Sequence, residues 1–157
     1  MNKSSLVHDT FVIERSYPKT PAQVFRAFSD PDLKRRWFAE GEGHEVVSFD
    51  MDFRIGGAER LVYRLGPATP FPGTAITSDT LIHDLVPNER IVASSTMVLA
   101  ERRMSCSLMT TELLATGEAT LLICTHQAVY YQGSDGPQLR QAGWRALLGR
   151  IAAQLPQ

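Results

Sequence analysis

The chain has 157 residues, of which 43% are hydrophobic and 21% are charged, and its formal net charge is −1 at pH 7. These values are typical of a globular protein and exclude an intrinsically disordered one. The balanced charge offers no basic surface for nucleic acid or a membrane, and no apolar run approaches the ~20 residues of a membrane-spanning helix. We therefore expect a single domain over residues 1–157 that binds neither.

The N-terminus and the two cysteines bear on the subcellular location of the protein. The N-terminus carries no hydrophobic signal segment, so we expect a cytoplasmic protein. Cys106 and Cys124 both fall in strand-like segments, where we expect them to be small buried apolar residues in a reducing compartment. A disulfide between neighbouring strands is the alternative.

The first predicted element is a strand over residues 7–17, in which apolar and polar side chains alternate except at Val12. A helix follows, because Thr20 is a favourable N-cap and Pro21 suits the first helical position.

Asp30 and Pro31 repeat this pattern and predict a second short helix. The two helices share an apolar, aromatic-rich side, which consists of Phe25, Phe28, Trp37 and Phe38. We expect these rings to converge where the helices meet the sheet. The neighbouring basic residues 34–36 are most simply a solvated face.

Further strands are predicted over residues 44–50, 52–65, 73–84, 90–99, 103–114 and 119–130. Gly56 and Gly57 fall inside one of them, where a glycine pair indicates a bulge or sharp bend in a strand that continues on both sides. Residues 86–90 form a turn. Because most connections are short, we expect antiparallel pairing.

The last element is a helix over about residues 137–155. Its apolar positions recur every three or four residues and include Leu139, Trp144, Leu148 and Ile151, whereas Arg140 is expected on the opposite, polar side.

This order of elements resembles the START-like helix-grip fold, and more narrowly its AHSA-type branch, the homologues of the C-terminal domain of activators of a heat-shock chaperone ATPase. The matching residues are Pro21-x-x-Val24-Phe25-x-Ala27-Phe28, Asp30-Pro31-x-Leu33-x-x-x-Trp37-Phe38, Gly56-Gly57, the 86–90 turn, Gly117-x-Ala-Thr120, and Gly143-Trp144 with Leu147-Leu148. The resemblance implies an α+β fold: a curved antiparallel sheet of about six to seven strands wrapped around a long C-terminal helix, with two short helices after the first strand.

Such a fold leaves a pocket between sheet and helix. Candidate pocket residues are aromatic, sulfur-containing or polar side chains, and one leucine, on the elements that face it: Phe25, Phe28, Trp37, Phe38, Phe53, Arg54, Tyr63, Met97, Met104, His126, Trp144 and Leu148.

Two of these could act chemically. His126 could donate a proton or orient a ligand near neutral pH, or could be a structural histidine held by a neighbouring strand. Arg54 could bind a ligand carboxylate through paired hydrogen bonds, or could form an ion pair on the outer face.

No spacing of histidines and cysteines indicates a metal, and Gly56-Gly57 is not a phosphate-binding loop, so we expect no metal, no cofactor and no assigned catalytic residue.

Three functions remain open. The first is a binding protein for a small hydrophobic molecule. The second is a chaperone-interacting domain, although eukaryotic activators carry an additional N-terminal domain that we do not expect here. The third is an enzyme similar to polyketide cyclases and aromatases, which would need an acid and a base in the pocket. A homodimer formed through the outer sheet face or an exposed strand edge is a further alternative.

Overall fold

The computed structural model describes residues 4–156 and contains a seven-stranded antiparallel sheet with the order β1-β7-β6-β5-β4-β3-β2. The strands are β1 (Val7–Tyr17), β2 (His44–Met51), β3 (Ala58–Leu65), β4 (Ala75–Val86), β5 (Arg90–Leu99), β6 (Arg102–Thr116) and β7 (Ala119–Tyr130). The helices are α1 (Pro21–Ser29), α2 (Pro31–Lys34), the π-helical η1 (Arg35–Ala39), α3 (Pro137–Arg150) and the 3₁₀-helical η2 (Ile151–Gln154).

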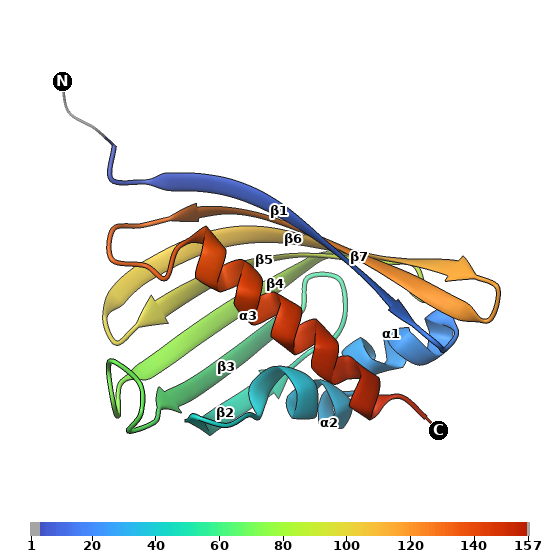
Figure 1. Cartoon of the computed structure of the whole chain (residues 1–157), viewed down its shortest axis with the longest axis horizontal. Coiled ribbons are helices and arrows are strands. Elements are labelled where there is room, and N and C mark those ends of the chain that lie inside the picture. Colours follow the sequence, from blue (N-terminus) through green and yellow to red (C-terminus); the bar gives the residue numbers. More distant parts are fainter. Residues whose placement is uncertain (1–3, 157) are drawn as a thin grey trace.

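The sheet curves around α3, which crosses its concave side, while α1 and α2 lie together near the C-terminal end of α3 (Figure 1). The predicted helix-grip fold is therefore confirmed. Within residues 4–156, no helix has the length and hydropathy that crossing a membrane requires.

The starts of the short helices follow the predicted caps. The Thr20 hydroxyl accepts from the Gln23 amide while the Gln23 side chain accepts from the Thr20 amide, a complete capping box. The Asp30 carboxylate accepts from the amides of Asp32 and Leu33 and so begins α2. The chain then widens into η1, which turns the Trp37 ring inward, and its Nε1 donates to the Ala27 carbonyl at 2.8 Å.

The prediction of one continuous strand over residues 52–65 is wrong. The chain reverses there to join β2 to β3 as an antiparallel hairpin, and Gly56 has a φ of +80°, which favours glycine. Gly57 has no room for a side chain, since a Cβ atom would lie 2.0 Å from the Asp52 carbonyl oxygen.

The hydrophobic core fills one end of the curved sheet. Buried side chains of α1, η1 and η2 pack there against β1, β6 and β7, and fully buried members include Val24, Trp37, Leu122 and Ile151. The Tyr17 hydroxyl donates to the Leu148 carbonyl oxygen at 2.6 Å and ties β1 to the end of α3.

The two cysteines have different surroundings. Cys124 is buried in the core as expected, but Cys106 is exposed, and both are free thiols. The expectation that Cys106 is buried is therefore wrong. Neighbouring residues on a strand point to opposite faces, and Cys106 lies between Ser105 and Ser107, which are the buried ones.

Candidate ligand pocket

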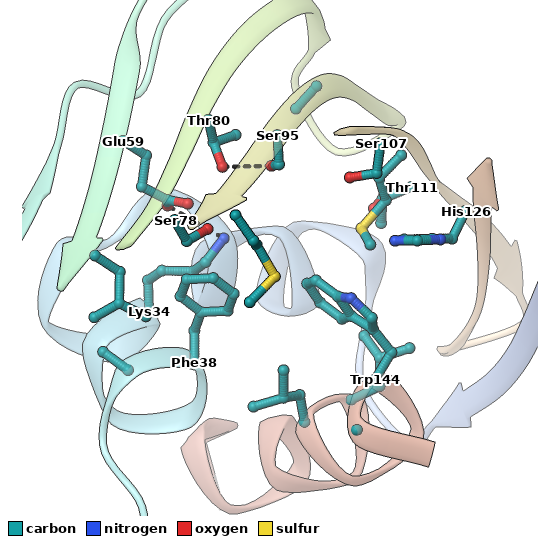
Figure 2. A pocket seen from close by; sticks show the side chains of 18 of the residues that line it. Lys34, Phe38, Glu59, Ser78, Thr80, Ser95, Ser107, Thr111, His126 and Trp144 are labelled. Carbon is teal, nitrogen blue, oxygen red and sulfur yellow. Dashed lines mark hydrogen bonds and ion pairs between the residues drawn. The ribbon is translucent and has the colours of Figure 1, made fainter. Parts of the chain in front are cut away.

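A cavity of about 330 Å³ lies between the concave face of the sheet and α3. Strands β3 to β7 form its floor, side chains of α1 and η1 close one end, and α3 covers it (Figure 2). Leu139 borders the cavity and yet is 68% exposed, and the neighbouring Gly143 is exposed as well. The N-terminal half of α3 therefore forms one side of the mouth.

Most of the candidate residues chosen from the sequence border this cavity. They are Phe28, Trp37, Phe38, Phe53, Tyr63, Met97, His126, Trp144 and Leu148. Phe38 and Trp144 lie beside each other on the helical side, with ring centroids 5.9 Å apart. The apolar part of the wall thus combines aromatic rings with aliphatic and methionine side chains.

Three candidates lie elsewhere. Phe25 is in the core and packs edge-on against Phe53 at a centroid distance of 5.6 Å. Met104 is buried at the start of β6 but does not border the cavity. Arg54 was predicted wrongly as a pocket residue, because the turn before β3 places it outside. Its side chain is 67% exposed and its Nε donates to Asp52 Oδ2 at 2.7 Å.

Small hydroxyl side chains line the floor at positions where a filled core would have large apolar residues. They come from three adjacent strands and are Ser78, Thr80, Ser95, Ser107 and Thr111. The Thr80 and Ser95 hydroxyls are hydrogen-bonded to each other at 2.6 Å. These short side chains leave the volume of the cavity unfilled and also make its floor polar.

A buried ion pair stands at the end near η1. Lys34 Nζ lies 3.3 Å from Glu59 Oε1, and the two side chains are only 13% and 9% exposed. The same ammonium group lies 4.7 Å from the centre of the Phe38 ring and 5.0 Å from that of Trp37, a cation–π arrangement. The expectation that residues 34–36 form a solvated face is therefore wrong for Lys34.

A second ion pair stands near the N-terminus of α3. Arg140 donates to both carboxylate oxygens of Asp135 at 2.8 Å and to the Ser105 hydroxyl at 2.9 Å, and it lies over the Tyr130 ring. Burial alone would raise the pKa of Asp135, but the hydrogen bonds and charge of Arg140, with the Ser134 hydroxyl, hold it below its ordinary value. Arg140 is thus buried against the sheet, and the prediction that it lies on the polar side of the helix is wrong.

His126 enters the pocket from β7, and its ring extends toward Trp144 (Figure 2). The imidazole is stacked on Phe11 with centroids 4.5 Å apart, the side chain is 1% exposed, and Nδ1 has no hydrogen-bond partner within the described chain. Burial, helped by the nearby positive charge of Arg140, lowers the pKa of His126 to about 4. The imidazole is therefore neutral at pH 7, which contradicts the expectation of a proton donor near neutral pH.

Tyr63 supplies a further neutral polar group. Its burial raises the pKa of the phenol, and the positive charge of Arg140 only partly opposes this effect. The hydroxyl therefore stays protonated at neutral pH. Its ring contacts His44 of β2 at a centroid distance of 4.9 Å.

The described residues offer no evident metal site, since no three side chains of His, Cys, Asp or Glu gather closely enough among residues 4–156. His44 and His83 are instead bonded to the Ala39 carbonyl and the Ser94 hydroxyl. The pocket therefore has an apolar wall and a floor that carries serine and threonine hydroxyls. It also contains two ion pairs, Lys34 with Glu59 and Arg140 with Asp135, and one buried histidine nitrogen.

Comparison with known families agrees with this architecture. The sequence profile of the family described as "Activator of Hsp90 ATPase homolog 1-like protein" (AHSA1) matches residues 18–155. The chain belongs to this family. No functionally curated protein matches the sequence.

Solved structures extend the comparison for this AHSA1-like chain. The Mll3558 protein from Rhizobium loti is 39% identical, with a TM-score of 0.86 over 97% of this chain and 100% of that one. A protein from Rhizobium leguminosarum is 34% identical, with a TM-score of 0.87 over 95% of each chain. DynU16, from the dynemicin biosynthetic locus, is 19% identical with a TM-score of 0.60, over 96% of this chain and 47% of that one, and so shares the fold.

Sequence reasoning missed the polar half of this AHSA1-like pocket. Glu59, Arg140 and three of the floor hydroxyl residues (Ser78, Ser107 and Thr111) are buried, yet each was ignored or assigned to solvent. One signal was available: Ser105, Ser107 and Thr111 alternate along a predicted strand with the same period as its core residue Leu113. Small hydroxyls at core positions indicate either a cavity or close packing, and only the three-dimensional structure distinguishes the two.

Proposed function

We propose that this AHSA1-like protein binds a small, mainly apolar molecule in the pocket between the sheet and α3. The observation that carries the proposal is the cavity itself. Its volume of about 330 Å³ falls at the lower end of the range for small-molecule sites. An apolar, aromatic wall with a few convergent polar groups is the usual composition of such sites.

The arrangement favours binding over catalysis. Lys34 and Glu59 are paired with each other, as are Arg140 and Asp135, so these four groups are occupied in holding the pocket together. His126 is a neutral imidazole without a neighbouring acid in hydrogen-bond contact. General acid–base catalysis needs a matched acid and base within reach of one substrate.

The family description supports a second candidate, an interaction with a chaperone. It would use the outer surface of the molecule rather than the pocket. The two functions therefore predict that different molecules stay bound to the purified protein: a small ligand in the first case and a chaperone subunit in the second.

The test is native mass spectrometry of the protein purified from its own host, followed by denaturing extraction of retained molecules. The binding proposal predicts a mass increase from one bound small molecule, which the extraction then releases. An empty protein that retains a chaperone subunit would contradict it and support the second candidate.

A further inference from the structure

The charges of the pocket are already balanced within it. The Lys34 ammonium contacts the Glu59 carboxylate, and the Arg140 guanidinium makes three hydrogen bonds to Asp135 and Ser105. A charged ligand would have to break one of these pairs or be buried without a counter-ion. Both alternatives are costly in a desolvated site. The pocket therefore favours a ligand without net charge.

His126 brings a buried ring nitrogen without a hydrogen-bond partner to the wall of the pocket. Its side chain is 1% exposed, its Nδ1 makes no hydrogen bond within residues 4–156, and its ring is fixed by stacking on Phe11. A buried polar atom without a partner costs free energy that a bound molecule would recover by supplying one. The outer end of the ring, away from the strand, faces the cavity (Figure 2), so a hydrogen-bond partner for the imidazole would come from the ligand.

The neutral state of the imidazole limits what this partner can be. In a neutral imidazole one nitrogen donates and the other accepts, and a hydroxyl group is complementary to either because it can both donate and accept. A carboxylate accepts only, and an ammonium donates only. Ser107 and Thr111 of β6 lie on either side of Met109, which pairs with His126 in the sheet, so further hydroxyls surround this position.

The opposite wall favours a flat apolar body. Phe38 and Trp144 border the cavity with their ring planes inclined by 32°, and Met97 and Met109 border it from the floor. Aromatic rings and thioether groups both make favourable contacts with an aromatic ligand.

Resting on the proposed function, we infer that the pocket selects an uncharged aromatic molecule bearing a hydroxyl group, whose hydroxyl is hydrogen-bonded to His126 and whose ring lies against Trp144. His126 thereby selects the chemical class of the ligand.

The contributions of the aromatic ring, the hydroxyl group and a negative charge to the affinity can be separated with three probes that share one ring system: naphthalene, 2-naphthol and 2-naphthoate. Their affinities are measured at pH 7 by equilibrium dialysis. We expect 2-naphthol to bind about five- to tenfold more tightly than naphthalene, the effect of one net hydrogen bond. We expect 2-naphthoate, which is an anion at this pH, to bind most weakly.

The variant His126→Phe retains a ring to stack on Phe11 and removes both nitrogens. It should reduce the affinity for 2-naphthol to that for naphthalene and leave naphthalene unchanged. The matched control is His83→Phe, which replaces an exposed histidine of β4 outside the cavity and should change neither affinity. If His126→Phe does not fold, the affinities of the unmodified protein for the three probes still test the assigned class of ligand.

The results that would contradict this inference can be told apart from those that would contradict the proposed function. Equal affinities for 2-naphthol and naphthalene, or tight binding of 2-naphthoate, would overturn the inference while leaving a binding pocket. A 2-naphthol preference that persists in His126→Phe would overturn the role of His126. Failure of all three probes to bind would count against the proposed function itself.

Discussion

The two tryptophans of the chain differ in their surroundings and therefore in their expected roles. Trp37 is completely buried in the core and donates a hydrogen bond to the Ala27 carbonyl. Trp144 is half-buried and borders the pocket beside Phe38. One ring belongs mainly to stability and the other mainly to the pocket.

We therefore expect the same substitution to destabilise the protein more at Trp37 than at Trp144. Trp37→Phe should lower the free energy of unfolding by about 2–4 kcal/mol, because it leaves a cavity and an unpaired carbonyl. Trp144→Phe should cost less than about 1 kcal/mol, as a half-buried aromatic exchange. Urea unfolding measures both, and equal losses would contradict this division.

His126 should make stability depend on pH. Its pKa is about 4 in the folded protein against an ordinary value of 6.5, because burial disfavours the charged form. Between these values the unfolded chain binds the proton and the folded protein does not, so stability falls as the pH drops through this window. The contribution amounts to about 3 kcal/mol over the whole window.

The check is urea unfolding of the unmodified protein and of His126→Phe at several pH values from neutrality to about pH 4. The difference between the two free energies of unfolding should change across this range. The lowered pKa of Asp135 also removes stability in acid, but below its ordinary value of 3.8 and in both proteins. Parallel pH profiles would show that His126 is not buried in its neutral form.

At the scale of the elements, two glycines show how local geometry decides the effect of a substitution. A Cβ atom on Gly57 would lie 2.0 Å from the Asp52 carbonyl oxygen, whereas on Gly143 of α3 it would meet nothing within 4 Å. Gly57 therefore permits the hairpin between β2 and β3, and Gly143 keeps open space beside the mouth of the pocket.

Gly57→Ala should destabilise the protein by about 2 kcal/mol or more, since backbone must move. Gly143→Ala should stabilise it by about 0.5–1 kcal/mol through higher helix propensity. Thermal unfolding of both variants tests the signs.

A larger side chain at the same position tests where the mouth of the pocket lies. Gly143→Leu should leave the stability unchanged and lower the rate at which 2-naphthol binds. An unchanged binding rate would place the mouth elsewhere.

Much of the element order could be predicted from the sequence because its signals are local. Thr20 and Asp30 cap their helices as their side chains predict, and the alternation from residue 7 to 17 gives the bounds of β1. The turn before β3 was missed because a glycine pair has the same signature in a bulged strand as in a hairpin. Arg54 was misplaced for that reason.

The polar part of the pocket depends on contacts that no local pattern records. Arg140 meets Ser105 across 35 positions of the chain, and Lys34 meets Glu59 across the space between α2 and β3. A charged residue in an amphipathic helix is normally solvated. Only the position of its partner shows that it is buried.

At the scale of the whole molecule, the sheet curves around α3 (Figure 1). The space between them holds a core at one end and a cavity along the rest of the helix. The small hydroxyls of β4, β5 and β6 are what keep this second region open. A homodimer, a chaperone partner and a cytoplasmic location stay predictions.

The central claim is that small molecules enter this cavity, and the methionine methyl groups report on it most directly. Met97 and Met109 border the cavity, whereas Met104 is buried in β6 away from it. In the NMR spectrum of ¹³C-methyl-methionine protein, saturating 2-naphthol should shift the resonances of Met97 and Met109 and leave that of Met104 in place. Shifts of Met104 alone, or no shift of Met97 and Met109, would contradict the account.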